Sequence, residues 1–118
     1  DRLGQVVRNL LDNATSFSPP QALVRIRVID AGSEAKLIVE DEGPGIPVGK
    51  FDAVFERFYS ERPAGEDFGV HSGLGLSISQ QIVLAHDGSI IASNRTGDDG
   101  AVSGARFEVR LPKDNPSI

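Results

Sequence analysis

A loop of glycine and proline divides this chain. Residues 41–47 read Asp-Glu-Gly-Pro-Gly-Ile-Pro, and they follow an apolar run. Proline removes a backbone donor and glycine weakens regular structure, so neither a helix nor a central strand can run through this segment. The fold must therefore be assembled from elements that end before residue 41 and begin again after residue 47.

The residues before this loop predict one helix and two strands. Apolar residues recur every three or four positions from residue 3 to residue 17, as on one face of a helix, and two prolines end that pattern. In residues 24–28 apolar and basic residues alternate, which predicts a strand with one solvent-exposed face. Residues 37–39 predict a more buried partner strand, and residues 31–34 predict the hairpin between them.

The residues directly after the loop predict two helices. Residues 51–59 suit a short helix that carries three phenylalanines, and residues 74–85 regain helical spacing. Gly88 follows the second helix, as is typical just beyond a helix end. Between the helices, residues 60–72 show little periodicity, so we expect a mobile loop there.

The end of the chain predicts a hairpin, and the order of elements then indicates a fold class. Residues 90–93 and 106–111 are typical of strands on either side of a polar loop, 95–104, and we expect the tail from Pro112 to fray. Helices and antiparallel strands in separate runs indicate an α+β fold, a two-layer sandwich with one helical layer on one mixed, mainly antiparallel sheet.

Composition narrows the possible functions. The 118 residues, 1–118, fit a single domain. The net charge of −5 disfavours a nucleic-acid partner, which normally meets a basic stripe. The absence of cysteine excludes disulfides, zinc knuckles and thiol catalysis, and no apolar run approaches the ~18 residues of a membrane span. Because the chain starts with Asp1 rather than Met, we expect it to be a piece of a longer protein.

Two asparagines form the first of three polar clusters. Asn9 and Asn13 lie four positions apart on the first predicted helix, so both amides share one face. An amide oxygen is a neutral hard ligand, suited to Mg²⁺ that already carries phosphate oxygens and water. A polar stripe on a solvated helix is an equally good explanation of this pair alone.

The other two clusters lie in loops. Asp41 follows a predicted strand, where its carboxylate can accept from an exocyclic amino group, while Gly43 and Gly45 admit a planar base and Ile46 forms an apolar wall. Residues 71–77, His-Ser-Gly-Leu-Gly-Leu-Ser, open the last helix, where free backbone amides and the helix dipole attract phosphate. Alone, each pattern is also explained by an ordinary turn or helix start.

In this order and spacing, the clusters resemble the ATP-binding catalytic domain of bacterial sensor histidine kinases. Residues 9–14 resemble the family's N box, 41–45 its G1 box, 55–59 its F box and 73–76 its G2 box. Residues 104–112 also resemble its final strand, so the match covers nearly the whole chain. Within the family, residues 55–79 are similar to the ChvG/ExoS group of membrane sensor kinases.

The resemblance implies a Bergerat fold with an ATP lid, and a site for ATP and Mg²⁺. Asp41 would hold the adenine amino group, Asn13 would ligate Mg²⁺, and Asn9 and Arg57 would be the catalytic residues, Arg57 offsetting charge on the γ-phosphate. Arg62 is a second candidate for that role. The residues assigned to nucleotide binding are Asn9, Asn13, Asp41, Gly43, Gly45, Ile46, Phe58, Tyr59, Arg62, Gly73, Leu74, Gly75 and Leu76.

The same resemblance implies the partners. They are a histidine on the dimerisation and phosphoacceptor domain of the same kinase, and a cognate response regulator. This chain would lack that acceptor domain and autokinase activity, would be monomeric, and would make no direct membrane contact. The longer protein would be a homodimer in the inner membrane, with this portion in the cytoplasm. We interpret His86 as structural, because Gly88 and a strand follow it, and His71 as solvated.

Two departures from the family pattern stand out. Ser16 occupies a place where relatives often have Lys or Arg near the end of the N box, so phosphate neutralisation would depend more on Arg57 and Arg62. The family usually has a strand before the first helix, which this chain lacks or barely begins. We therefore expect an exposed sheet edge or some loss of stability.

Three alternatives stay open. An ATPase of the gyrase or HSP90 type, or a serine kinase of the anti-sigma type, generally has a Glu base where this chain has Asn9, and an amide takes no proton at neutral pH. A nucleotide-binding module that is inactive in isolation is the third.

Overall fold

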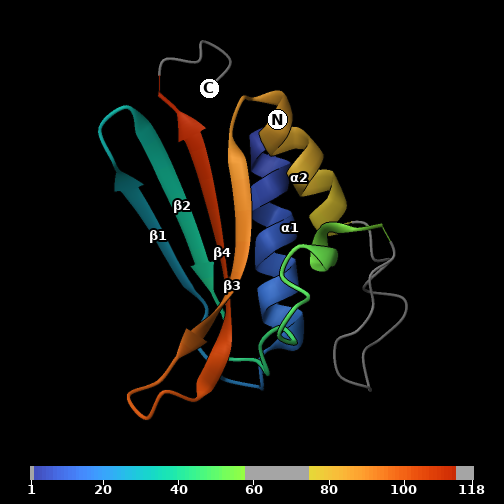
Figure 1. Ribbon diagram of the computed structural model, residues 1–118, viewed down its shortest axis with the longest axis vertical. Coiled ribbons are helices and arrows are strands. Elements are labelled where there is room, and N and C mark those ends of the chain that lie inside the picture. The colour runs from blue at the N-terminus through green and yellow to red at the C-terminus, as the bar shows by residue number, and fades with distance from the viewer. Residues whose placement is uncertain (1, 58–74, 114–118) are drawn as a thin grey trace.

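The computed structural model describes residues 2–57 and 75–113, and they form two layers (Figure 1). The elements are α1 (Arg2–Phe17), β1 (Arg25–Asp30), β2 (Glu34–Glu40), the 3₁₀ turn η1 (Ala53–Phe55), α2 (Gly75–Ala85), β3 (Ser89–Thr96) and β4 (Val102–Pro112). The strand order is β1-β2-β4-β3, and each neighbouring pair is antiparallel. The predicted α+β class is confirmed, and the described strands make an antiparallel rather than a mixed sheet.

One face of the sheet packs against the helices to form the core. In Figure 1, α1 and α2 lie side by side against this face. Phe107 of β4 is 1% exposed and meets Phe55 edge to face, with ring centroids 6.1 Å apart. The other core side chains come from both layers: Val6, Leu10, Ala14, Val39, Ile46, Val54, Ile82, Val83, Ile90, Ala92, Ala105 and Val109.

The opposite face of the sheet carries a charge ladder, which we define as Glu40, Arg106, Glu108 and Arg110. Arg106 lies 3.3 Å from Glu108 and 3.9 Å from Glu40, and Arg110 forms an ion pair with the other oxygen of Glu108. The Arg110 hydrogen bond holds the pKa of Glu108 below its usual 4.5. Charged side chains on this face therefore neutralise one another within the fold.

The predicted helix at 51–59 is wrong where it can be compared. The described part is a single 3₁₀ turn, Ala53–Phe55, and Glu56 is already extended. Val54 and Phe55 are buried, and one turn is enough to bring both side chains into the core.

Two predictions about the strands also need correction. β1 was expected to have one exposed face, but Ile26 and Val28 are 48% and 77% exposed because the helices lie over the other strands (Figure 1). The loop predicted at 95–104 is shorter, since β3 runs to Thr96 and β4 begins at Val102. The strands continue through polar residues there because the side chains of Asn94 and Arg95 bind a neighbouring loop.

The exposed sheet edge expected from the sequence is present. β1 is the outermost strand of the described sheet and pairs with β2 alone among the described strands. Neither described helix has the length and apolar character that a membrane crossing requires.

Candidate functional site

Asp41 lies immediately after β2 and is the anchor of the candidate site. Only 1% of the residue is exposed. Its carboxylate Oδ1 accepts hydrogen bonds from the backbone amides of Gly43 and Ala105, both at 2.9 Å. Its own amide donates to the carbonyl of Ala105 at 3.0 Å, and Arg95 donates to its carbonyl oxygen at 3.2 Å. The carboxylate is therefore held in one position by backbone groups from its own turn and from β4.

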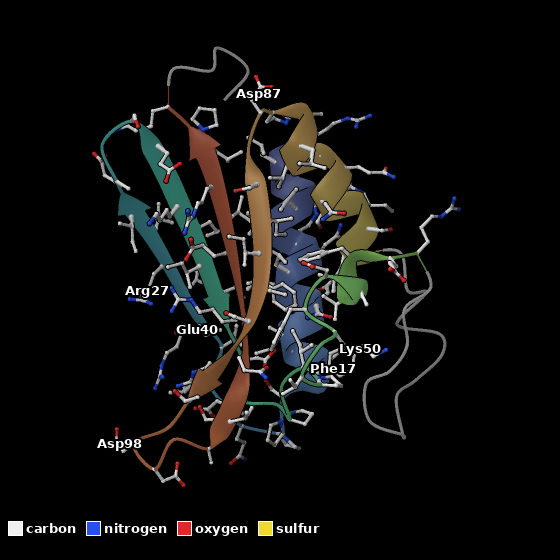
Figure 2. The ribbon with its side chains drawn as sticks, viewed as in Figure 1. Phe17, Arg27, Glu40, Lys50, Asp87 and Asp98 are labelled. Atoms are coloured by element: carbon white, nitrogen blue, oxygen red, sulfur yellow. The ribbon has the colours of Figure 1, made fainter. Side chains whose placement is uncertain are left out.

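The loop after Asp41 packs closely on the rest of the protein. A Cβ on Gly43 would lie 2.5 Å from the carbonyl oxygen of Phe17, and the hydroxyl of Ser18 accepts from the amide of Glu42 at 3.3 Å. Figure 2 shows Phe17 at the end of α1 beside this loop. Gly43 was predicted to admit a planar base. The geometry adds that glycine is needed for close approach of the protein's own backbone.

Asn9 connects α1 to the beginning of α2. Its Nδ2 donates to the carbonyl of Gly75 at 3.3 Å and to the hydroxyl of Ser79 at 3.2 Å. Ser79 is fully buried. These two bonds fix the first described turn of α2, where backbone amides were predicted to meet phosphate. The segment predicted to be the N box and the described part of the predicted G2 box are therefore in direct contact.

Asn13 lies one helical turn beyond Asn9, between the two regions just described. Its Nδ2 is buried and has no hydrogen-bond partner among the described residues. A buried amide without a partner costs about 1–3 kcal/mol, which a polar ligand at this place would recover. The side chain also offers an oxygen that can ligate a hard cation such as Mg²⁺. The residue thus fits the metal role predicted for it.

Several predicted residues lie along one face of α1 in the described part of the molecule. Asn9, Asn13 and Phe17 lie on successive turns of this helix, so the face they share runs from the start of α2 to the loop of Asp41. Asp87, by contrast, lies at the far end of the molecule (Figure 2). No group of three or more His, Cys, Asp or Glu among the described residues could form a metal site by itself.

Other predicted residues are placed less fully. Arg57 is exposed and is the last described residue before the gap. Leu76, in the first turn of α2, is partly buried against the core. Phe58, Tyr59, Arg62, Gly73 and Leu74 lie outside the described residues, as do the predicted lid and His71.

His86 lies at the end of α2, where its Nδ1 is 2.9 Å from the carbonyl oxygen of Ile82. A ring nitrogen bonded to the last turn of a helix agrees with the structural role expected from the sequence.

Three residues of β3 and β4 contact the site, although nothing in the sequence assigns them a role there. Asn94 binds the backbone of Ile46, Arg95 binds that of Asp41, and a Cβ on Gly104 would lie 1.8 Å from the Asp41 carbonyl oxygen. Arg95 and Gly104 lie in the segment that predicts a loop and Asn94 directly before it, so no local pattern marks them as site residues. Only the register Asn94↔Ala105 and Arg95↔Gly104 brings them to the site.

Comparison with known protein families identifies one match. The model of the HATPase_c family, described as histidine kinase-, DNA gyrase B- and HSP90-like ATPases, matches residues 1–115. Among curated proteins, the chain is 51% identical over 112 residues to the sensor protein ChvG of Rhizobium meliloti, and 44% identical over 112 residues to the histidine-protein kinase/phosphatase MprB of Mycobacterium tuberculosis. The two alignments cover 94% and 93% of this chain but only 19% and 21% of those proteins. The chain therefore spans about a fifth of their length.

Solved structures give the same result. The mycobacterial sensor histidine kinase MprB superposes with a TM-score of 0.79 at 36% identity, over 94% of this chain and 70% of that one. The nucleotide-free catalytic domain of the histidine kinase ThkA superposes with a TM-score of 0.77 at 29% identity, over 95% of this chain and 66% of that one. The fold is therefore that of histidine kinase catalytic domains.

Proposed function

Because the chain belongs to the HATPase_c family, we propose that it binds Mg·ATP and donates the γ-phosphoryl group to a histidine on the phosphoacceptor domain of a sensor kinase. One observation carries this proposal. A single face of α1 joins the loop of Asp41 to the start of α2, with the buried, unpartnered amide of Asn13 between them. A ligand with a base at one end and phosphates at the other fits that arrangement.

The base is bound at the loop end. Asp41 accepts from the exocyclic amino group of adenine, because its carboxylate is already fixed by two backbone amides. Gly45 and the buried side chain of Ile46 provide the surface against which the ring lies. A base with a carbonyl oxygen in place of that amino group would face the carboxylate with an acceptor, so the site favours adenine over guanine.

The phosphates are bound at the helix end. The backbone amides of Gly75 and Leu76 at the start of α2, together with those of the preceding residues Gly73 and Leu74, would donate to phosphate oxygens there. Asn13 would hold Mg²⁺, which supplies charge neutralisation when bound. Arg57 offsets the charge that develops on the γ-phosphate during transfer, and Arg62 assists it.

The state of Asn9 favours transfer to an external nucleophile over hydrolysis. An ATPase needs a base that activates water, and an amide cannot accept that proton. Both Nδ2 bonds of Asn9 are made to α2, so this side chain acts as a structural donor. We therefore rank a kinase above a gyrase-like or HSP90-like ATPase and above an anti-sigma serine kinase.

The curated relatives also suggest what the longer protein is. Relatives five times as long are sensor proteins and histidine kinases, so we propose that the longer protein is a homodimeric, membrane-bound sensor with this domain in the cytoplasm. The acceptor histidine then lies on its dimerisation domain, and a response regulator receives the phosphoryl group next. The isolated chain is a monomer that holds nucleotide without autophosphorylation.

Calorimetric titration with Mg·ATP tests the binding step. We expect Asp41→Asn to weaken binding by tenfold or more, because a hydrogen bond to a charged group contributes about 1.5–3 kcal/mol. Glu40→Gln is the matched control, since it removes the adjacent carboxylate from the opposite face of the sheet, and its affinity should equal that of the wild type. Equal affinities for all three proteins would contradict the assignment of Asp41.

A transfer assay tests the reaction. The chain is mixed with labelled ATP, with and without a dimeric helical hairpin that carries the acceptor histidine of the same kinase. We expect acid-labile phosphate on the hairpin alone. Label on His71 or His86 of the chain, or rapid release of inorganic phosphate without the hairpin, would contradict the kinase proposal.

A further inference from the structure

The side chain of Asn94 satisfies the backbone of Ile46. Its Oδ1 accepts from the Ile46 amide at 2.7 Å, and its Nδ2 donates to the Ile46 carbonyl at 2.9 Å. Within the described residues, the main chain of Ile46 makes no other hydrogen bond than these two. One primary amide thus does for Ile46 what a neighbouring strand does for a residue in a sheet. Two such bonds hold a backbone unit in both position and orientation.

The contact between the loop and the hairpin is tight. Ile46 is 3% exposed, and its neighbour Gly45 has a φ of +82°. A Cβ on Gly45 would lie 2.8 Å from Asn94 Oδ1 and 2.6 Å from Cγ1 of Val102. A side chain at position 45 would therefore push the loop away from Asn94, so glycine there allows the loop to lie close enough for the two Ile46 bonds to form.

One pair of neighbouring residues in the sheet holds both groups that are proposed to contact the base, the carboxylate of Asp41 and the side chain of Ile46. Asn94 of β3 is paired with Ala105 of β4. The Ala105 amide donates to the Asp41 carboxylate, and the Asn94 side chain binds Ile46. The carboxylate and the apolar wall therefore take their relative position from two adjacent residues of a rigid sheet. Loss of the Asn94 bonds frees the wall while the carboxylate stays fixed.

We propose that Asn94 is a positioning residue for nucleotide recognition, which sets the place of Ile46 relative to Asp41 and so sharpens the choice of adenine over guanine. The inference rests on the proposed function, because it assumes that Asp41 and Ile46 meet the base. Asn94 acts through Ile46, without a role in metal binding or phosphoryl transfer. Its effect is therefore confined to the base.

The first experiment needs no nucleotide. Hydrogen exchange of the Ile46 amide is measured by NMR in the wild-type chain, in Asn94→Ala and in Ser93→Ala. Ser93 is the matched control because it is the adjacent residue of β3 and points to the other face of the sheet. We expect exchange at Ile46 to accelerate by about tenfold in Asn94→Ala only, since each lost bond contributes roughly 0.5–1.5 kcal/mol. Unchanged exchange would overturn the proposal.

The second experiment measures affinity for ATP, ADP and GTP in the same three proteins. We expect Asn94→Ala to weaken the binding of ATP and of ADP by the same factor, about tenfold. The ratio of ATP affinity to GTP affinity should fall, and the dependence of ATP affinity on Mg²⁺ should stay unchanged. Equal losses for ATP and GTP would indicate a merely structural role, and a loss for ATP without ADP would place the effect at the phosphates. Either result overturns the proposal. Faster exchange at Ile46 in a chain that binds no ATP even as wild type would contradict the proposed function instead.

Discussion

The two faces of the sheet hold their polar groups in different ways. On the outward face, Glu108 forms ion pairs with both Arg106 and Arg110, and the acidic side chains are covered by the basic ones. At the end of the helix-facing side, Asp41 is bound through Oδ1 by backbone amides, and Asn13 has an Nδ2 with no partner among the residues described. The first face satisfies its charges within the fold. The second fixes polar groups in space and leaves bonding capacity for a ligand.

In this chain of net charge −5, polar groups that serve the fold can thus be told apart from polar groups that are available to a ligand. Mutual ion pairs at a surface contribute little to stability, so their residues can be exchanged with only a small effect. Polar groups held by backbone in a buried site cannot be exchanged, because each depends on the exact path of the chain around it. Substitutions on the two faces should therefore differ in both size and kind of effect.

The largest effect is expected for Gly104→Ala. The added Cβ would lie 1.8 Å from the Asp41 carbonyl oxygen, and Gly104 has a φ of +155°. We expect a loss of about 3 kcal/mol or more in the free energy of unfolding, measured by urea titration, because backbone must move. Gly32→Ala is the control, with a φ of +80° but open space around it, and should cost only about 1–2 kcal/mol. Equal costs would show that the contact with Asp41 can relax.

Asn13→Ala should change function without harming the fold. We expect the affinity for ATP to lose its dependence on Mg²⁺, with a drop of about tenfold at saturating metal. The nucleotide-free protein should be as stable as the wild type or slightly more so, because an unsatisfied buried amide is removed. Asp12→Asn, at the adjacent exposed position of α1, should change neither property. An Asn13→Ala variant that still responds to Mg²⁺ would contradict the metal role.

Arg106→Gln should have a small effect, since it alters only the charge ladder. Arg106 is paired with Glu40 and Glu108 at a surface where its own side chain is 33% exposed. We expect unfolding free energy to fall by less than about 1 kcal/mol and ATP affinity to stay the same. A loss of affinity comparable to that of Asp41→Asn would show that the two faces are coupled.

The smallest effect is a pH dependence on the outward face. The Arg110 hydrogen bond lowers the pKa of Glu108 below 4.5 in the folded protein, so the ionised form is the one that stabilises the fold. That contribution is present above pH 4.5 and is lost as the pH falls through the lowered value. The stability difference between the wild type and Glu108→Gln, measured by urea unfolding at each pH, should therefore hold from about pH 7 down to pH 4.5 and shrink at lower pH. A constant difference would mean that the pair contributes nothing.

Much of the fold could be predicted from the sequence. The helix expected at residues 3–17 is Arg2–Phe17, and the one expected at 74–85 is described as Gly75–Ala85. α1 carries a deeply buried apolar face with a strong helical period, whereas α2 buries Ile82 and Val83 together with Ser77 and Ser79. The strands were also predicted, but with bounds that were too short. β3 and β4 continue through polar residues such as Asn94 and Arg95, whose side chains find hydrogen-bond partners only through tertiary contacts.

The candidate site was predictable where residue type and spacing express its chemistry. Asn9, Asn13 and Asp41 stand out because amides one turn apart and a carboxylate after a strand have an identifiable use. Asn94 and Arg95 do not, since their contacts are to backbone atoms some fifty residues away. Such contacts leave no local pattern. The roles assigned to the site residues stay predictions until the titrations above are made.

The uncovered edge of β1 has a practical consequence for those experiments. Ile26 and Val28 are exposed on a strand that has a hydrogen-bonded neighbour on one side only in the described sheet. Such an edge accepts a further strand from a second copy of the chain, so concentrated solutions are prone to self-association. Arg25 and Arg27 alternate with those residues and oppose this by charge repulsion, which salt weakens. Titrations are therefore best made at low ionic strength and checked by light scattering, so that aggregation is not mistaken for a change in affinity.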